Sequence, residues 1–168
     1  FNFSDKVKFV FVEHHLAHIS SAFYASNYDN AIGLSIDGSG DFTSLMIAEC
    51  NNKKIKVKKR VHFPDSLGIF YHAMTQFIGF RKFGDEYKMM GLASYGKPIY
   101  FDKLLDNLFL NSKDFFKLNL DFFNHDTVNF NYSHIGSEDI PDIYKGKLDN
   151  LFKPDIAIDT SEMFKKNF

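Results

Sequence analysis

A short apolar run, a glycine-rich Asp-containing loop and a second apolar run constrain the fold of this chain most strongly. Ala31–Ile36 is predicted as a buried strand, and Phe42–Ala48 as a strand that returns beside it. Asp-Gly between two such runs is a strong β-hairpin signal. The glycines of Asp37–Asp41 would also let backbone N–H groups approach an oxyanion, with Asp37 as a hard anionic ligand. Both interpretations stay open, because a hairpin loop can also carry a ligand.

A pair of histidines precedes this hairpin. In the helix predicted at about His14–Ser26, His14 and His18 are four residues apart, so both imidazoles leave the same face and can bind one divalent ion. His15 points elsewhere. The same spacing is also typical of a polar helix surface, and only the addition of Asp37 at the strand end predicts a three-ligand metal site.

The surrounding pattern is typical of an α/β protein. Val7–Val12 is predicted as a strand before the helix, and Ile55–His62 as the third strand of a meander. In the basic run Lys53–Arg60, apolar Ile55 and Val57 alternate with charged residues. This alternation favours a solvated strand face over a phosphate-binding patch.

Helical periodicity governs the residues after Ser66. It predicts a buried helix up to Gly79, with Tyr71 in the core, and a second helix at Asp85–Ala93. A short helix is expected around Leu104–Phe109.

The last part of the chain carries weaker patterns. Phe115–Phe123 and Thr127–Tyr132 are predicted to form an edge hairpin, and Ile156–Phe168 either begins a helix or is a fraying tail. His62 and His125 have no constellation around them and are expected at the surface.

Composition excludes several classes of partner. With 20 basic and 21 acidic residues the formal net charge is −1, so bulk electrostatics favour neither a nucleic acid nor a membrane surface. Cys50 is the single cysteine, which excludes an internal disulfide framework and suits the reducing cytoplasm. The sequence shows no signal peptide and no apolar run long enough to cross a bilayer.

Four sequence blocks occur in a fixed order between Lys8 and Pro98. They are Glu13–His18 with Ser21–Ser26, Ile36–Asp41, Phe63–Gly68 with Tyr71, and Gly79-Phe80 followed by Gly84–Gly96. Together they resemble the amino-terminal part of the carbamoyltransferase family, the O-carbamoyltransferases of nodulation-factor and antibiotic biosynthesis. The Gly84–Gly96 block is the longest and most unusual of the four.

The resemblance implies a fold and a division of the chain. It implies part of an actin/sugar-kinase-like, ribonuclease H-like lobe with a helical insertion, in a fragment of a two-lobe domain. Within 1–168, residues 1–62 would form the strand/helix core with the metal and phosphate motifs, 63–98 the family-specific helical insertion, and 99–168 the remaining region.

The resemblance also implies an activity. Family members transfer a carbamoyl group from carbamoyl adenylate to a substrate hydroxyl, and a separate YrdC-like domain makes the adenylate from carbamoyl phosphate and ATP. By motif, His14, His18 and Asp37 would hold a divalent ion, with Fe(II) the expected one. A fourth ligand, an aspartate of the second lobe, has no match in this chain.

The resemblance also implies roles for other residues. Gly38, Ser39, Gly40 and Asp41 would bind the phosphate of the nucleotide, and His15 and Lys88 are the candidate catalytic residues. His15 would orient a ligand or accept the proton of the hydroxyl, or it is a structural histidine. Lys88 would contact phosphate, or it forms a salt bridge with Glu86 at a helix start.

Two other functions remain open. One is a tRNA threonylcarbamoyl- or hydrogenase-maturation-type carbamoyl transfer protein, which shares the pair of histidines but lacks a Gly84–Lys88-type block. The other is a non-catalytic nucleotide-binding or interaction module.

Overall fold

The computed structural model describes residues 7–113, 115–128 and 141–156 of the chain. It divides into two compact units, residues 1–63 and 64–168. We call them the first and the second unit. The first combines one helix with an antiparallel sheet, and the second is mainly helical.

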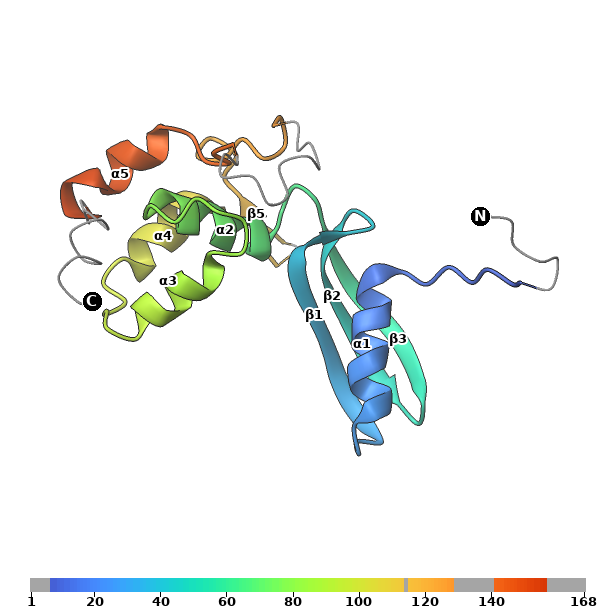
Figure 1. Ribbon diagram of the computed structural model, residues 1–168. Coiled ribbons are helices and arrows are strands. Elements are labelled where there is room, and N and C mark those ends of the chain that lie inside the picture. The colour runs from blue at the N-terminus through green and yellow to red at the C-terminus, as the bar shows by residue number, and fades with distance from the viewer. Residues whose placement is uncertain (1–6, 114, 129–140, 157–168) are drawn as a thin grey trace. The chain divides into compact units, whose positions relative to one another are not determined.

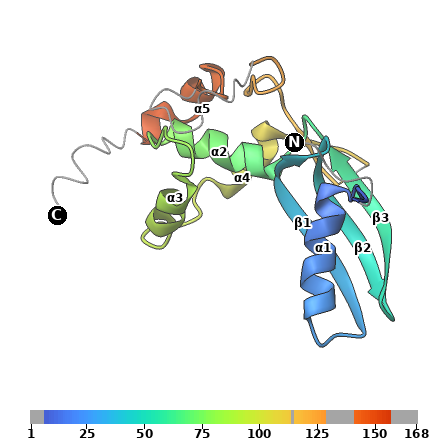
Figure 2. The same ribbon diagram turned by 45° about the vertical axis from the view of Figure 1, so that its right-hand side comes forward.

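The first unit has two layers. Strands β1 (Asn30–Gly40), β2 (Thr43–Asn51) and β3 (Lys54–His62) form an antiparallel sheet in the order β1-β2-β3. Helix α1 (His14–Ala25) lies along one face of this sheet, against β1 and β2 (Figures 1 and 2). The predicted meander beside a helix is confirmed. β2 and β3 are slightly longer than predicted, and β1 extends beyond Ile36 through the predicted loop to Gly40.

Both connections in the sheet are two-residue hairpin turns. Asp41 and Phe42, and likewise Asn52 and Lys53, have positive φ angles, as type I′ turns require. The first hairpin turn is therefore Asp41-Phe42, directly after the glycine-rich segment that ends at Gly40. Asp37–Gly40 remains part of β1, with an irregular register between Ile36 and Gly40.

Small residues on β1 let α1 approach the sheet closely. Gly33 faces the helix, and a Cβ there would meet Cγ2 of Ile19 at 2.5 Å. Ile19 and Phe23 of α1 are buried with Met46, Ala48 and Cys50 of β2. On the basic strand β3, Ile55 and Val57 pack against this core while Lys54, Lys56 and Lys58 are exposed. The predicted solvated basic face is thus confirmed.

The strand predicted at Val7–Val12 is wrong. The segment carries no strand or helix, and its residues are exposed. A strand needs a neighbour that accepts and donates its backbone hydrogen bonds. Apolar composition alone therefore did not determine the structure of this segment.

The described residues of the second unit form four helices and a small hairpin. Its elements are α2 (Leu67–Phe77), α3 (Glu86–Ala93), α4 (Phe101–Leu108), β4 (Phe109–Leu110), β5 (Lys117–Leu118) and α5 (Lys147–Ile156). The Ser66 hydroxyl accepts a hydrogen bond from the N–H of Ile69 and caps α2, which ends before Gly79 at a φ of 102°. The three helices predicted here are confirmed.

The core of the second unit is aromatic and aliphatic. Its buried members come from helices and from the segments between them: Ala73, Met74, Leu108, Leu118, Phe122, Phe123, Ile143, Leu148 and Phe152. Phe123 is fully buried. Helix α5 contributes Leu148 and Phe152, although no helix was predicted before Ile156.

The prediction of a strand over the whole of Phe115–Phe123 is wrong, because only Lys117–Leu118 is a strand. Instead β5 pairs with β4, and Phe123 forms an isolated bridge with Tyr144. Burial of Phe122 and Phe123 in the core, rather than alternation along the chain, sets this arrangement. Residues 129–132 and 157–168, where the second strand and the last predicted helix were expected, lie outside the described residues.

His125 is also not a surface residue. Its side chain is buried, and Nε2 lies 2.7 Å from the carbonyl oxygen of Pro64. This partner is 61 positions away in the sequence. No local pattern could have indicated it. His62, by contrast, is exposed as predicted.

Candidate metal site

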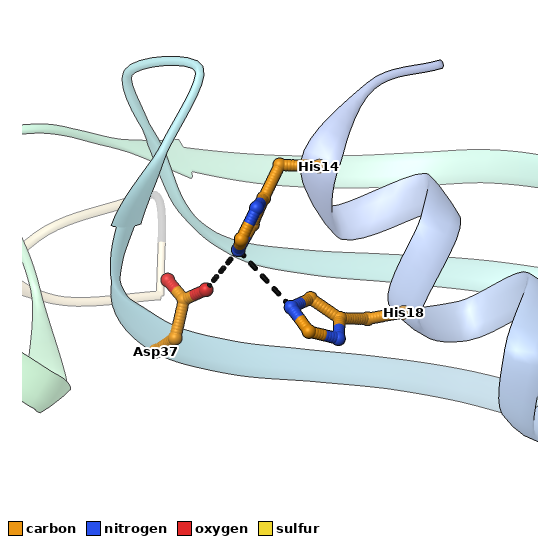
Figure 3. A group of neighbouring side chains, drawn as sticks. All are labelled: His14, His18 and Asp37. Atoms are coloured by element: carbon orange, nitrogen blue, oxygen red, sulfur yellow. Dashed lines mark hydrogen bonds and ion pairs between the residues drawn. The ribbon is translucent and has the colours of Figure 1, made fainter.

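Three side chains of the first unit converge on one point. His14 and His18 come from consecutive turns of α1, and Asp37 comes from the irregular end of β1 (Figure 3). Nε2 of His14 lies 2.6 Å from Oδ2 of Asp37 and 3.1 Å from Nε2 of His18. One potential ligand atom from each residue lies within 4.8 Å of the other two. The structure thus brings together the residues that the sequence grouped.

The donor set fits a divalent transition metal. Each ligand atom lies about 2.0–2.2 Å from a bound ion, so two donors can stand up to about 4 Å apart around it. The His14 ring nitrogen lies closer than this to the facing atoms of Asp37 and His18. A small outward movement of these side chains would make room for an ion. Two imidazoles and one carboxylate with open positions are the ligands typical of non-haem Fe(II) sites. The His14 and Asp37 side chains are 42% and 30% exposed, so an ion can enter from solvent.

The hairpin between β1 and β2 holds the first histidine in place. The carboxylate of Asp41 accepts a hydrogen bond of 2.8 Å from the backbone N–H of His14, the first residue of α1. This contact satisfies one of the N–H groups left without a partner at the helix start. Gly40 lies directly against the imidazole, because a Cβ at this position would fall 2.1 Å from Cδ2 of His14.

A second contact joins the residue before α1 to strand β3. Arg60 on β3 donates two hydrogen bonds to Glu13, from Nε to Oε1 at 2.8 Å and from Nη2 to Oε2 at 2.7 Å. The hydrogen bond with Arg60 lowers the pKa of Glu13 and raises that of Arg60. Sequence reasoning missed this pair, since 47 positions separate the two residues.

His15 lies beneath the site and is fully buried. Its Nδ1 is 2.7 Å from the hydroxyl oxygen of Ser35, and its Nε2 is 2.8 Å from the carbonyl oxygen of Thr43 and 3.3 Å from Oδ1 of Asp37. Of the roles that the sequence left open, this position favours orientation of a ligand or a structural role over direct contact with a substrate.

The four residues predicted to bind phosphate lie in different surroundings. Gly40 and Asp41 contact α1, as described above. Gly38 has no atom within 4 Å of the place where a Cβ would stand, and Ser39 is exposed.

Lys88 belongs to the second unit and takes part in local interactions. Its ammonium lies 2.6 Å from Oδ1 of Asp85, one turn earlier at the start of α3, and 5.8 Å from the ring centroids of Phe80 and Tyr87. Glu86, the partner expected from sequence, instead pairs with Nδ1 of His72 at 2.6 Å. The salt-bridged helix start is thus present, with a different acidic residue. Burial, together with the nearby Glu86 charge, raises the pKa of Tyr71.

Comparison with known proteins identifies the family of the chain. A family model described as "Carbamoyltransferase N-terminus" matches residues 2–153. The chain is 41% identical over 119 residues to the uncharacterized protein sll1178 of Synechocystis sp., a match covering 70% of this chain and 19% of that protein.

Two rhizobial proteins show similar identity. The chain is 40% identical over 110 residues to the nodulation protein NolNO of Sinorhizobium fredii, covering 61% of this chain and 16% of that protein. It is 42% identical over 89 residues to the nodulation protein NolO of Bradyrhizobium diazoefficiens, covering 52% and 16%. The chain belongs to the carbamoyltransferase family, and the resemblance found in its sequence motifs is confirmed. The matches span less than a fifth of the length of these relatives.

Within the described ranges, every helix is too short or too polar to cross a bilayer.

Proposed function

We propose that this chain supplies part of an enzyme that transfers a carbamoyl group from carbamoyl adenylate to a substrate hydroxyl. The observation that carries the proposal is the convergence of His14, His18 and Asp37 in a chain of the carbamoyltransferase family. We further propose that the first unit is part of an actin/sugar-kinase-like lobe. Its antiparallel meander with a helix on one face is compatible with such a lobe.

In this proposal, His14, His18 and Asp37 hold a divalent ion, Fe(II) being the expected one. The ion would stabilise negative charge that develops on the transferred carbamoyl group. The hydroxyl oxygen of the acceptor forms a bond to the carbamoyl carbon and loses its proton to solvent, the bond from that carbon to the phosphate oxygen breaks, and AMP leaves. The residues of α1 and β1 fix where this exchange takes place, since a donor held in one geometry reacts faster than one that diffuses.

Gly38 and Ser39 are proposed to face the phosphate of the adenylate. They follow Asp37 directly on the irregular end of β1, so a phosphate held by their N–H groups would lie within a few residues of the metal. The further parts of the proposal are a YrdC-like domain that forms the adenylate from carbamoyl phosphate and ATP, a small-molecule hydroxyl acceptor, a cytoplasmic location, and no nucleic-acid or membrane partner.

Metal binding is the first test. Isothermal titration of the chain with Co²⁺ or Fe²⁺ should show weak 1:1 binding that His14→Ala or His18→Ala abolishes. Binding should be weaker at about pH 6 than at about pH 8, because an imidazole must be neutral to coordinate. His62→Ala is the matched control, since His62 is exposed at the end of β3. Equal binding by wild type and His14→Ala would contradict the metal site.

Carbamoyl transfer is the second test. The isolated chain should not transfer the group from added carbamoyl adenylate, because ligands from one lobe leave the reacting atoms poorly oriented and open to water. In the complete enzyme, His18→Ala should abolish transfer while adenylate formation continues. Measuring the two half-reactions separately distinguishes these steps. Rapid transfer by the chain alone would show that the two-lobe proposal is wrong.

A further inference from the structure

Strand β1 forms one outer edge of the sheet in the first unit (Figure 1). Within the described residues, no strand pairs with its outer side. Successive side chains of a strand point to opposite faces, and Gly33 faces α1, since it lies against Ile19. Ile32, Leu34 and Ile36 therefore point to the other face, where they are 72%, 58% and 44% exposed. We call these three residues the apolar row.

The apolar row also carries the outward-facing backbone groups of β1. The N–H of Asn52 donates to the carbonyl oxygen of Asp29, just before the strand. In an antiparallel pair, hydrogen-bonded positions alternate along the strand. The register therefore directs the N–H and C=O groups of every second residue from Ala31 to Ser35 toward β2. Those of the apolar row point to the outer side.

The other edge of the sheet is built differently. Strand β3 carries three exposed lysines, Lys54, Lys56 and Lys58, and its register with β2 is irregular. Charged side chains and irregular register hinder an edge strand from pairing with another chain. From Asn30 to Ile36, β1 has no charged residue, no proline and no register shift. An edge with an exposed apolar row and none of these features is typical of an interaction surface.

We propose that β1 pairs with β1 of a second copy of this chain, in antiparallel orientation about a two-fold axis at Leu34. The apolar row is its own complement in this arrangement. Leu34 lies opposite Leu34 of the second copy, and Ile32 lies opposite Ile36, so each outward N–H meets an outward carbonyl oxygen. The two three-stranded sheets become continuous, and the two apolar rows lie side by side on one face. The proposal is independent of the metal site.

The helix on each sheet fits this arrangement. Because α1 lies against β1 and β2, the two copies of α1 would stand about two strand spacings apart, or roughly 10 Å. Packed helices lie about 8–10 Å apart. The groove between α1 and the outer side of β1 is lined on the helix by Ala22 and Ser26, whose small side chains leave room for a neighbouring helix.

The experiment measures the mass of the 168-residue chain by sedimentation equilibrium at concentrations up to about 1 mM, which populates even a weak, small interface. We expect a dimer that dissociates on dilution. Leu34→Lys places two ammonium groups beside the two-fold axis, and Leu34→Pro removes a backbone N–H that makes no bond to β2. Both variants should keep the circular dichroism of wild type and stay monomeric. Lys56→Thr, on the other edge, is the control and should dimerise like wild type.

Hydrogen exchange locates the interface. The amide protons of the apolar row should exchange more slowly at high concentration than after dilution. A wild-type chain that stays monomeric at the highest concentration, or a dimer that persists in Leu34→Lys, would overturn the proposal. Leu34→Lys decides alone if Leu34→Pro unfolds. Slow exchange of these amides in a monomer would also overturn it, because a segment of the same chain would then cover the edge.

Discussion

The two units use the same kinds of side chain differently. In the first unit, three imidazoles and the Asp37 carboxylate gather at the start of one helix, with two of the rings partly open to solvent. In the second, His125 contacts the backbone of Pro64, and His72 pairs with Glu86. His72 and His125 thus join segments of the second unit, while His14 and His18 direct nitrogen atoms at a common point.

Buried polar side chains also have different roles in the two units. In the second unit the Gln76 amide donates to the carbonyl oxygen of Pro141 and accepts from the N–H of Ile143, which joins α2 to a distant segment. In the first unit, buried His15 contacts a candidate ligand. Convergence of donor atoms, and not the presence of histidine, therefore distinguishes a candidate metal site from an ordinary packing role. The following predictions test whether the site depends on the first unit alone.

The largest expected effect comes from the core of the second unit. Phe123→Ala removes a fully buried ring and should lower the free energy of unfolding of that unit by about 3–5 kcal/mol. Thermal unfolding followed by NMR would measure this. Co²⁺ binding at the first unit should persist, because none of the three ligands belongs to the affected core. Loss of Co²⁺ binding together with the fold of the second unit would contradict the independence of the site.

A glycine beside the site should be the next most sensitive position. In Gly40→Ala, the new Cβ would overlap the His14 ring, so the imidazole must move away from Asp37 and His18. We expect Co²⁺ affinity to fall about 10- to 100-fold, as for loss of a group that orients a ligand. Gly38→Ala is the matched control, because nothing lies within 4 Å of its Cβ position. Equal affinities in the two variants would show that close packing of Gly40 does not position His14.

Much of this arrangement could be predicted from sequence, and the limits have physical causes. The spacing of His14 and His18 and the strand before Asp37 are local patterns, so both were recognised. Val7–Val12 has the composition of a strand, yet its structure depends on a partner that composition does not supply. The contacts of His125 with Pro64, and of Arg60 with Glu13, join residues 61 and 47 positions apart. Such pairs depend on the fold and leave no short-range signal.

The hairpin cap on α1 should have an intermediate effect. Asp41→Ala removes the acceptor for the N–H of His14 and places alanine at a φ of 51°, where asparagine and aspartate are better tolerated. We expect the first unit to lose about 2 kcal/mol of stability, with comparable shares from the lost cap and the backbone. Chemical denaturation measures this. Asp41→Asn keeps an acceptor oxygen and should be nearly neutral, so equal destabilisation by both substitutions would contradict the capping role.

The smallest effect should come from the Glu13–Arg60 pair. Its side chains are 28% and 36% exposed, and pairs at the surface contribute only about 0.5 kcal/mol. A double-mutant cycle with Glu13→Gln and Arg60→Met, monitored by denaturation at neutral pH, should return a coupling of this size. A coupling of zero would show that the two hydrogen bonds do not stabilise the folded chain relative to the same side chains hydrated separately.

The pH dependence of this coupling has a definite sign. Because Arg60 lowers the pKa of Glu13 in the folded chain, the unfolded chain binds more protons between that lowered pKa and the ordinary glutamate value of about 4.3. The contribution of the pair should therefore be complete above about pH 5 and decline as the pH falls through the lowered pKa. Repeating the cycle at several pH values isolates the pair from other carboxylates. Coupling that grew on acidification would reverse this sign, and the Glu13–Arg60 contact would then not be the cause of the pKa shift.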